Sequence, residues 1–165
     1  METVKRTKTY SASPEDVFDC LDDLGVTGMH MKKSSMPMMG GRMNIEFLSL
    51  YTTGLHTKYR WTGNVLWMLL DFTVLVTKWI RGQEKSWETV VPAKLIIMSW
   101  FKMDLMIEGN DLHTTAHLSI SYEKPKGLFN RVLCFLLAGW YCRWCLKNML
   151  NDTEKRLQSY KNFRT

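Results

Sequence analysis

The sequence predicts an α+β fold in which a curved antiparallel sheet packs against one long C-terminal helix. Three observations predict this fold. Residues 2–10 and several segments between residues 43 and 123 alternate apolar and polar side chains with the period of a strand. Residues typical of turns separate these segments. From residue 128 to about residue 163, no proline and only one glycine interrupts a helical pattern.

The composition is that of one globular domain. The chain has 165 residues, of which 45% are hydrophobic, and we expect a single domain over residues 1–165. The formal net charge of +6 is spread along the sequence, so we expect no nucleic-acid partner and only a weak attraction to acidic membranes. The 12 methionines and 7 tryptophans suit irregular apolar surfaces, because methionine adapts its shape and tryptophan supplies a large area.

The sequence contains no candidate membrane span. The longest uncharged apolar run near the C-terminus covers residues 132–142, whereas a bilayer requires about 20 residues. The N-terminal METVKRTKTY is charged and lacks the apolar part of an export signal. The four cysteines do not form the pattern of a secreted disulfide framework, so we expect a cytoplasmic protein.

The first predicted strand, residues 2–10, leads into a helix start. In SASPEDVFDCLDD, Ser13 is a capping residue, Pro14 suits the first helical position, and acidic residues follow at the positive end of the helix dipole. Gly25 and Gly28 then end this short helical segment. Residues 29–43 hold six methionines, which predicts a loop with a pliable apolar surface that serves as a lid. A Cu(I) site in this loop is the less favoured alternative.

The remaining strands follow one another along the chain with turns between them. We expect them at about residues 43–51, 58–62, 71–81, 85–91, 100–108 and 113–123. The last two have one dry and one polar face. Met103 and Leu105 alternate with polar neighbours in the first of them, as do Leu118 and Ile120 in the second. The long helix would lie across the dry face and bury it.

This order of elements, together with the SASPEDVFDCLDD segment, resembles the SRPBCC superfamily of START-like, birch-pollen-allergen-like and polyketide-cyclase-like proteins. The resemblance extends over essentially the whole chain. It implies a helix-grip fold, in which the curved antiparallel sheet wraps around the long C-terminal helix and a short helical segment follows the first strand. It also implies a cavity between the sheet and the helix that holds a hydrophobic ligand. The superfamily shares no single catalytic motif, so no catalytic residue is assigned.

We therefore expect the protein to bind a hydrophobic small molecule or lipid, as a carrier, a sensor or a sequestering protein, without a cofactor. The alternative is an enzyme of the cyclase or dehydratase type that acts on an aromatic or polyketide-like substrate in the same cavity. Such an enzyme needs a titratable group with a shifted pKa in the cavity, and Lys78 and Tyr122 are the candidates. A third hypothesis is a protein-interaction module that uses the surface of the helix.

Twelve side chains are expected to line the cavity, because they lie on the dry faces of strands or on one face of the helix. They are Tyr59, Trp61, Lys78, Trp87, Met103, Leu105, Leu118, Ile120, Tyr122, Leu137, Trp140 and Trp144. For most of them the alternative is an ordinary hydrophobic core. Lys78 interrupts the apolar face of its strand, and it is either a ligand contact or a residue at the rim.

The stretch GWYCRWCLKNML places Cys142 and Cys145 on nearly the same face of the helix. A redox CxxC motif lies at a helix N-terminus, where the helix dipole lowers the thiol pKa, whereas this pair lies in mid-helix. Zinc needs two further ligands, and the sequence offers no second pair with the required spacing. We expect both thiols to be small apolar groups, we expect no metal, and we expect Trp140 and Trp144 to face the sheet.

The C-terminal helix carries more apolar residues than one buried face can use. The surplus residues are Phe129, Phe135, Tyr141, Leu146 and Leu150. This surplus predicts a homodimer contact or transient membrane docking, and the alternative is that neighbouring strands and the first helical segment cover it.

Overall fold

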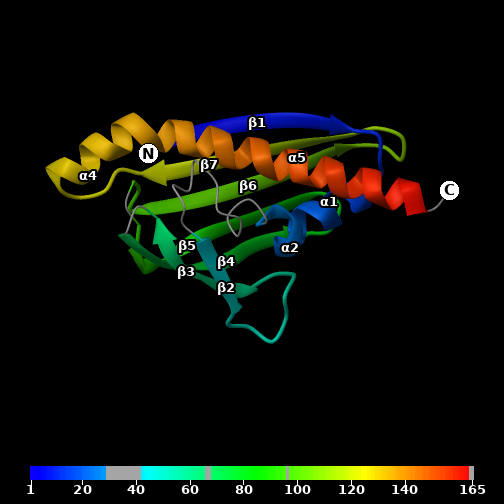
Figure 1. Ribbon diagram of the computed structural model, residues 1–165. Helices are drawn as coiled ribbons and strands as arrows, with labels where there is room; N and C mark the ends of the chain where they lie inside the picture. Colours follow the sequence, from blue (N-terminus) through cyan, green and yellow to red (C-terminus); the bar gives the residue numbers. More distant parts are fainter. Residues whose placement is uncertain (29–41, 66–67, 96, 164–165) are drawn as a thin grey trace.

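Among the described residues, seven strands form one antiparallel sheet in the order β1-β7-β6-β5-β4-β3-β2 (Figure 1). The computed structural model describes residues 1–28, 42–65, 68–95 and 97–163. The strands are β1 (Glu2–Tyr10), β2 (Arg42–Phe47), β3 (Lys58–Val65), β4 (Met68–Ile80), β5 (Glu84–Lys94), β6 (Trp100–Gly109) and β7 (Thr114–Glu123). Strands β2 to β7 form a meander, which confirms the prediction from alternating side chains.

Strand β1 joins the sheet next to β7, at the edge opposite β2. The pairing runs from Glu2 opposite Tyr122 to Tyr10 opposite Thr114. No local pattern predicted this pairing, because the register between two distant segments is set by the whole sheet.

Helix α1 (Pro14–Asp22) begins where the sequence predicted. The side chain of Ser13 accepts a hydrogen bond from the backbone N–H of Asp16 at 3.2 Å. Pro14 occupies the first helical position, where its missing N–H is not needed. The helix start therefore needs no tertiary contact to be defined.

A second short helix, α2 (Leu24–Thr27), follows α1 directly. It begins at Asp23, whose carboxylate accepts a hydrogen bond from the backbone N–H of Gly25 at 2.7 Å. At its end, a Cβ atom on Gly28 would lie 2.9 Å from Cη2 of Trp61. Glycine at this position therefore allows the turn to lie directly against the sheet.

The C-terminal helix runs from Leu128 to Phe163, which confirms the long helix predicted there. It consists of α4 (Leu128–Leu133), a π-helical turn η2 (Cys134–Ala138) and α5 (Gly139–Phe163). Figure 1 shows it lying along the sheet beside β1, and α5 contacts β1, β7, α1 and α2. The α+β architecture expected from the sequence is therefore confirmed.

The face of this helix that packs on the sheet consists largely of small side chains. Cys134, Ala138 and Cys142 are at most 2% exposed, and Leu146 continues the same face with no exposed surface. Small side chains let the helix axis approach the sheet closely, because protein interiors are packed without large voids.

The prediction that Leu137 and Trp140 face the sheet is wrong. Leu137 is 37% exposed and Trp140 is 49% exposed. The segment is apolar on almost every side, so the spacing of apolar residues did not identify the buried face, and close packing selects the small residues instead. Of the surplus residues, Phe135 is exposed, whereas Leu146 and Leu150 lie in the core.

None of the helices in the described part of the chain combines the length and the apolarity needed to cross a membrane.

Residues 29–41, which include most of the methionine-rich segment predicted as a lid or as a Cu(I) site, lie outside the described residues. The last methionine of that segment, Met43, lies in β2 and is buried.

We expect Leu146→Ala to lower the free energy of unfolding by about 2–5 kcal/mol, because it removes a fully buried side chain. The matched control is Leu136→Ala on the same helix, whose side chain is 62% exposed and whose loss should stay below about 1 kcal/mol. Urea denaturation followed by circular dichroism measures both free energies. Equal losses, or a larger loss for Leu136→Ala, would contradict the orientation of the helix.

Candidate ligand-binding site

The inner face of the sheet is the face covered by α1 and the C-terminal helix. Eight of the twelve predicted site residues lie there, and each is at most 6% exposed. They are Tyr59, Trp61, Trp87, Met103, Leu105, Leu118, Ile120 and Tyr122. The predicted faces of β6 and β7 are confirmed, because Met103 pairs with Ile120 and Leu105 with Leu118.

Lys78 does not lie on this inner face. Its side chain is 52% exposed, and its Nζ lies 2.7 Å from Oε1 of Glu84. The cause is an irregularity in β4, where the register shifts between Val76 and Lys78 and the alternation changes phase. Trp79, opposite Lys85, takes the inward position that the sequence pattern assigned to Lys78.

Trp144 lies at the side of the packed helix face. It is half-buried, and its ring centroid lies 5.8 Å from that of Tyr141. Cys142 and Cys145 take the inward positions that the sequence analysis gave to the tryptophans. The large buried side chains of the core therefore come mainly from the sheet.

A buried ion pair joins α1 to the inner face of the sheet. Nζ of Lys85 on β5 lies 2.6 Å from Oδ1 of Asp22 at the end of α1, and both side chains are at most 6% exposed. Nε1 of Trp79 donates a hydrogen bond to Oδ2 of Asp22 at 2.9 Å. The ammonium of Lys85 also lies 4.8 Å from the ring centroid of Trp87.

The buried polar atoms differ in how they are satisfied. Oδ1 of Asp22 lies 2.6 Å from Nζ of Lys85, so the ion pair satisfies it. Within the described part of the chain, Oγ1 of Thr57, just before β3, is buried without a hydrogen-bond partner. Each unsatisfied buried polar group costs about 1–3 kcal/mol, and a hydroxyl or carbonyl group of a guest would relieve that cost.

Burial also changes the acidity of the groups in this cluster. Desolvation lowers the pKa of Lys85 below its ordinary value, and the attraction of Asp22 offsets this only in part. Desolvation raises the pKa of Tyr59, and the charge of Asp22 raises it further. The inner face therefore holds an amine that releases its proton more readily than an exposed lysine does.

Lys85 and Asp22 were not among the predicted site residues, although the sequence contains a signal for Lys85. Lys85, Trp87 and Thr89 occur at every second position of β5, so an inward Trp87 also requires an inward Lys85. The position of Asp22 depends on where the end of α1 meets the sheet, and no local pattern shows that.

Tyr122, the second titratable candidate, is buried and already has a partner. Its hydroxyl donates a hydrogen bond to Oε2 of Glu2 on β1 at 2.7 Å. Burial raises the pKa of Tyr122, and the hydrogen bond to Glu2 raises it further. A phenol held in this way keeps its proton at neutral pH, so it suits orientation of a ligand better than proton abstraction.

All four cysteines are buried. Burial raises the pKa of both Cys142 and Cys145 to about 12, and that of Cys20 to about 11. Thiols of this kind are poor nucleophiles at neutral pH. Their burial agrees with the prediction that Cys142 and Cys145 serve as small apolar groups.

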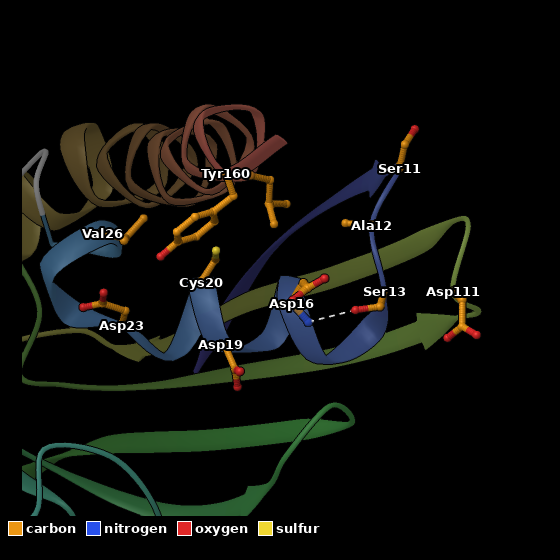
Figure 2. Close-up of a pocket in the computed structure, with 11 residues that line it drawn as sticks. Ser11, Ala12, Ser13, Asp16, Asp19, Cys20, Asp23, Val26, Asp111 and Tyr160 are labelled. Carbon is orange, nitrogen blue, oxygen red and sulfur yellow. Dashed lines mark hydrogen bonds between the residues drawn. The ribbon is translucent and has the colours of Figure 1, made fainter. Parts of the chain in front are cut away.

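A separate pocket of about 580 Å³ lies between α1, the end of α5 and the β6–β7 turn (Figure 2). Its walls carry four carboxylates and two serine hydroxyls, from Asp16, Asp19, Asp23, Asp111, Ser11 and Ser13. Asp19 is paired with Arg81, with Oδ2 and Nη2 2.5 Å apart. Figure 2 shows Tyr160 extending from α5 towards α1. Ala12, Cys20, Val26, Leu157 and Tyr160 complete the lining. The pocket is not the site expected from the sequence, because it lies away from the predicted sheet residues and carries four carboxylates.

No protein-family model and no curated protein sequence matches the chain. Solved structures match it over nearly its whole length. A protein from Thermus thermophilus superposes with a TM-score of 0.71 at 15% identity, covering 96% of this chain and 99% of that chain. The Zhui aromatase/cyclase from Streptomyces sp. R1128 superposes with a TM-score of 0.67 at 13% identity, covering 94% of this chain and 95% of that chain.

A third match is norcoclaurine synthase from Thalictrum flavum, in complex with dopamine and hydroxybenzaldehyde. Its TM-score is 0.62 at 11% identity, and the match covers 96% of this chain and 87% of that chain. The chain has the helix-grip fold. The resemblance to the SRPBCC superfamily is confirmed at the level of the fold, which is what a likeness at these identities shows. In this fold, Lys85 lies on the inner face of the sheet and Asp22 faces it from α1.

We expect Lys85→Met to lower the free energy of unfolding by about 3–5 kcal/mol, because it leaves the carboxylate of Asp22 buried without its counter-ion. Lys78→Met is the matched control, since the partly exposed pair with Glu84 contributes about 0–1 kcal/mol. Urea denaturation measures both losses. Changing both partners of the buried pair, Lys85→Met with Asp22→Leu, should recover part of the lost stability. Equal losses of stability for Lys85→Met and Lys78→Met would argue against a buried pair.

The raised thiol pKa values predict a loss of stability at high pH. The unfolded thiols ionise near pH 9, whereas the folded ones remain protonated up to about pH 12. Their contribution is therefore complete below pH 9 and declines as the pH rises from 9 to 12, by about 1 kcal/mol for each thiol at pH 10.

This dependence is measured by urea denaturation at pH 8 and pH 10. The variant Cys142→Ala with Cys145→Ala should lose less stability over this interval than the unchanged protein. The same dependence in both proteins would show that the two thiols are not desolvated as described.

Proposed function

We propose that the protein binds a hydrophobic small molecule or lipid that carries one polar group, held between the inner face of the sheet and the C-terminal helix. The buried ion pair between Lys85 on the sheet and Asp22 on α1 carries the proposal, since it keeps two charged groups in an apolar interior. An apolar core is often equally or more stable without a buried ion pair. A pair retained there therefore favours recognition of a polar group.

The apolar part of the guest would contact the aromatic residues of the sheet. Tyr59, Trp61 and Trp87 are each at most 5% exposed and surround the polar cluster on β3 and β5. Transfer of the guest from water would contribute roughly 25 cal/mol per Å² of apolar surface, and the polar cluster would set its orientation. The norcoclaurine synthase structure contains dopamine and hydroxybenzaldehyde, and that match supports an aromatic guest with a hydroxyl or carbonyl group.

The lowered pKa of Lys85 favours an enzyme of the cyclase or dehydratase type as the second candidate. An amine whose pKa is lowered by burial gives up its proton more readily, and in its neutral form it can accept a proton from carbon next to a carbonyl group. In this alternative, Lys85 takes the role that the sequence analysis gave to Lys78, and the Zhui aromatase/cyclase supports it as a protein of the same fold. Turnover of the guest, in addition to its binding, separates the two candidates.

We expect native mass spectrometry and solvent extraction to reveal an apolar guest in protein purified from its host. For a defined probe pair, 2-naphthol should bind more tightly than naphthalene in calorimetry, because its hydroxyl can meet the polar cluster. In the variant Lys85→Met with Asp22→Leu, binding of 2-naphthol should weaken by about 2- to 10-fold, the equivalent of one hydrogen bond.

Lys78→Met is the control for this experiment, because its side chain lies on the outer side of the sheet. It should leave the affinity for both probes unchanged. Absence of a co-purified guest, together with no saturable binding of either probe, would refute the proposed function. Conversion of an added polyketide-like ketone that is lost in the double variant would instead support the enzyme.

A further inference from the structure

The outer face of the C-terminal helix is apolar where a surface helix is ordinarily polar. The exposed apolar residues described in α4, η2 and the start of α5, here called the outer apolar face, are Leu128, Val132, Phe135, Leu136, Leu137 and Trp140. Their exposed fractions range from 37% to 82%. They point away from the sheet, because Cys134, Ala138 and Cys142 occupy the buried side of the same helix.

The same part of the chain is strongly basic. From residue 124 to residue 151 the sequence contains five lysines and arginines and no acidic residue. Arg131, Arg143 and Lys147 lie on the helix and are exposed. Arg143 and Lys147 follow Leu136 and Trp140 by seven residues each, so they continue the same side of the helix.

We propose that the outer apolar face docks on the surface of an anionic phospholipid bilayer, with the helix lying in the plane of the interface. Exposed leucine, phenylalanine and tryptophan side chains beside arginine and lysine are the features of helices that bind in this way. The apolar residues would enter the boundary between headgroups and acyl chains. Arg131, Arg143 and Lys147 would meet the negative charge of the lipid headgroups.

The charge favours a bilayer over a second copy of the chain as the occupant. A symmetric dimer through this face would bring Arg131, Arg143 and Lys147 of both copies together, and like charges at an interface oppose association. An anionic lipid surface compensates these charges instead. The proposal does not rest on the proposed ligand, because docking uses the outer side of the helix and the ligand would use the inner side.

The chain provides a matched apolar control surface. Leu50 and Tyr51, between β2 and β3, are 97% and 76% exposed but lie outside the basic segment. If exposed apolar area alone were sufficient, both surfaces would contribute equally to membrane binding. If the combination with basic residues is required, only the outer apolar face contributes.

Co-sedimentation with large vesicles tests the proposal. The unchanged protein should bind vesicles of phosphatidylcholine with about 30% phosphatidylserine, should bind pure phosphatidylcholine much less, and should be released by high salt. Phe135→Ser with Leu136→Ser should reduce the bound fraction about tenfold. Leu50→Ser with Tyr51→Ser should leave it unchanged, and circular dichroism confirms that both variants are folded.

A second pair of variants tests the charges. Arg143→Gln with Lys147→Gln should weaken binding to the anionic vesicles several-fold, whereas Lys155→Gln with Arg156→Gln, further along the same helix, should leave it unchanged. No binding, equal binding to both vesicle types, or an equal loss in the control variants would overturn the proposal. A dimer in light scattering that Phe135→Ser with Leu136→Ser converts to a monomer, without vesicle binding, would assign the face to a second copy and also overturn it.

Discussion

The close approach of the C-terminal helix to the sheet determines how the other parts of the molecule are used. Cys134, Ala138 and Cys142 form the contact, and none of them is more than 2% exposed. Where the small residues contact the sheet, the larger residues of the helix, such as Phe135 and Trp140, lie on the outside. The helix thus presents small neutral groups to the interior and a mixture of apolar and basic groups to the surroundings. If the proposed guest binds, its recognition would depend mainly on side chains of the sheet.

Helix α1 is held against the sheet by two ion pairs that differ in environment. Asp22 meets Lys85 in the interior, and three residues earlier Asp19 meets Arg81 at the surface. Both basic partners belong to the region where β4 turns into β5. The helix is therefore fixed to one hairpin from two sides, and the polar cluster of the inner face depends on this attachment.

The sequence was sufficient for the order of the elements and for most of the inner face. Alternation placed Met103, Leu105, Leu118 and Ile120 correctly, because β6 and β7 are regular and have one dry side. Lys78 was misplaced because the register irregularity in β4 reverses the alternation, and an irregularity of this kind depends on the neighbouring strand rather than on local sequence.

The errors in the helix have a different physical origin. Where nearly all residues are apolar, hydrophobicity does not distinguish the two faces, so the choice between Cys142 and Trp140 depends on side-chain volume and on the surface beneath. The ion pair between Asp22 and Lys85 joins a helix to a strand more than sixty residues away, and only the assembled fold brings these charges together.

The pairing of β1 with β7 has a consequence for the newly made chain. During synthesis at about 5–20 residues per second, β1 waits on the order of ten seconds before its partner strand has been made. In the completed sheet β1 stands at one end of the strand order, so it is an edge strand among the described strands. An open edge can pair with strands of other molecules, and charged side chains oppose such pairing. Lys5 and Arg6 place positive charge on this edge strand.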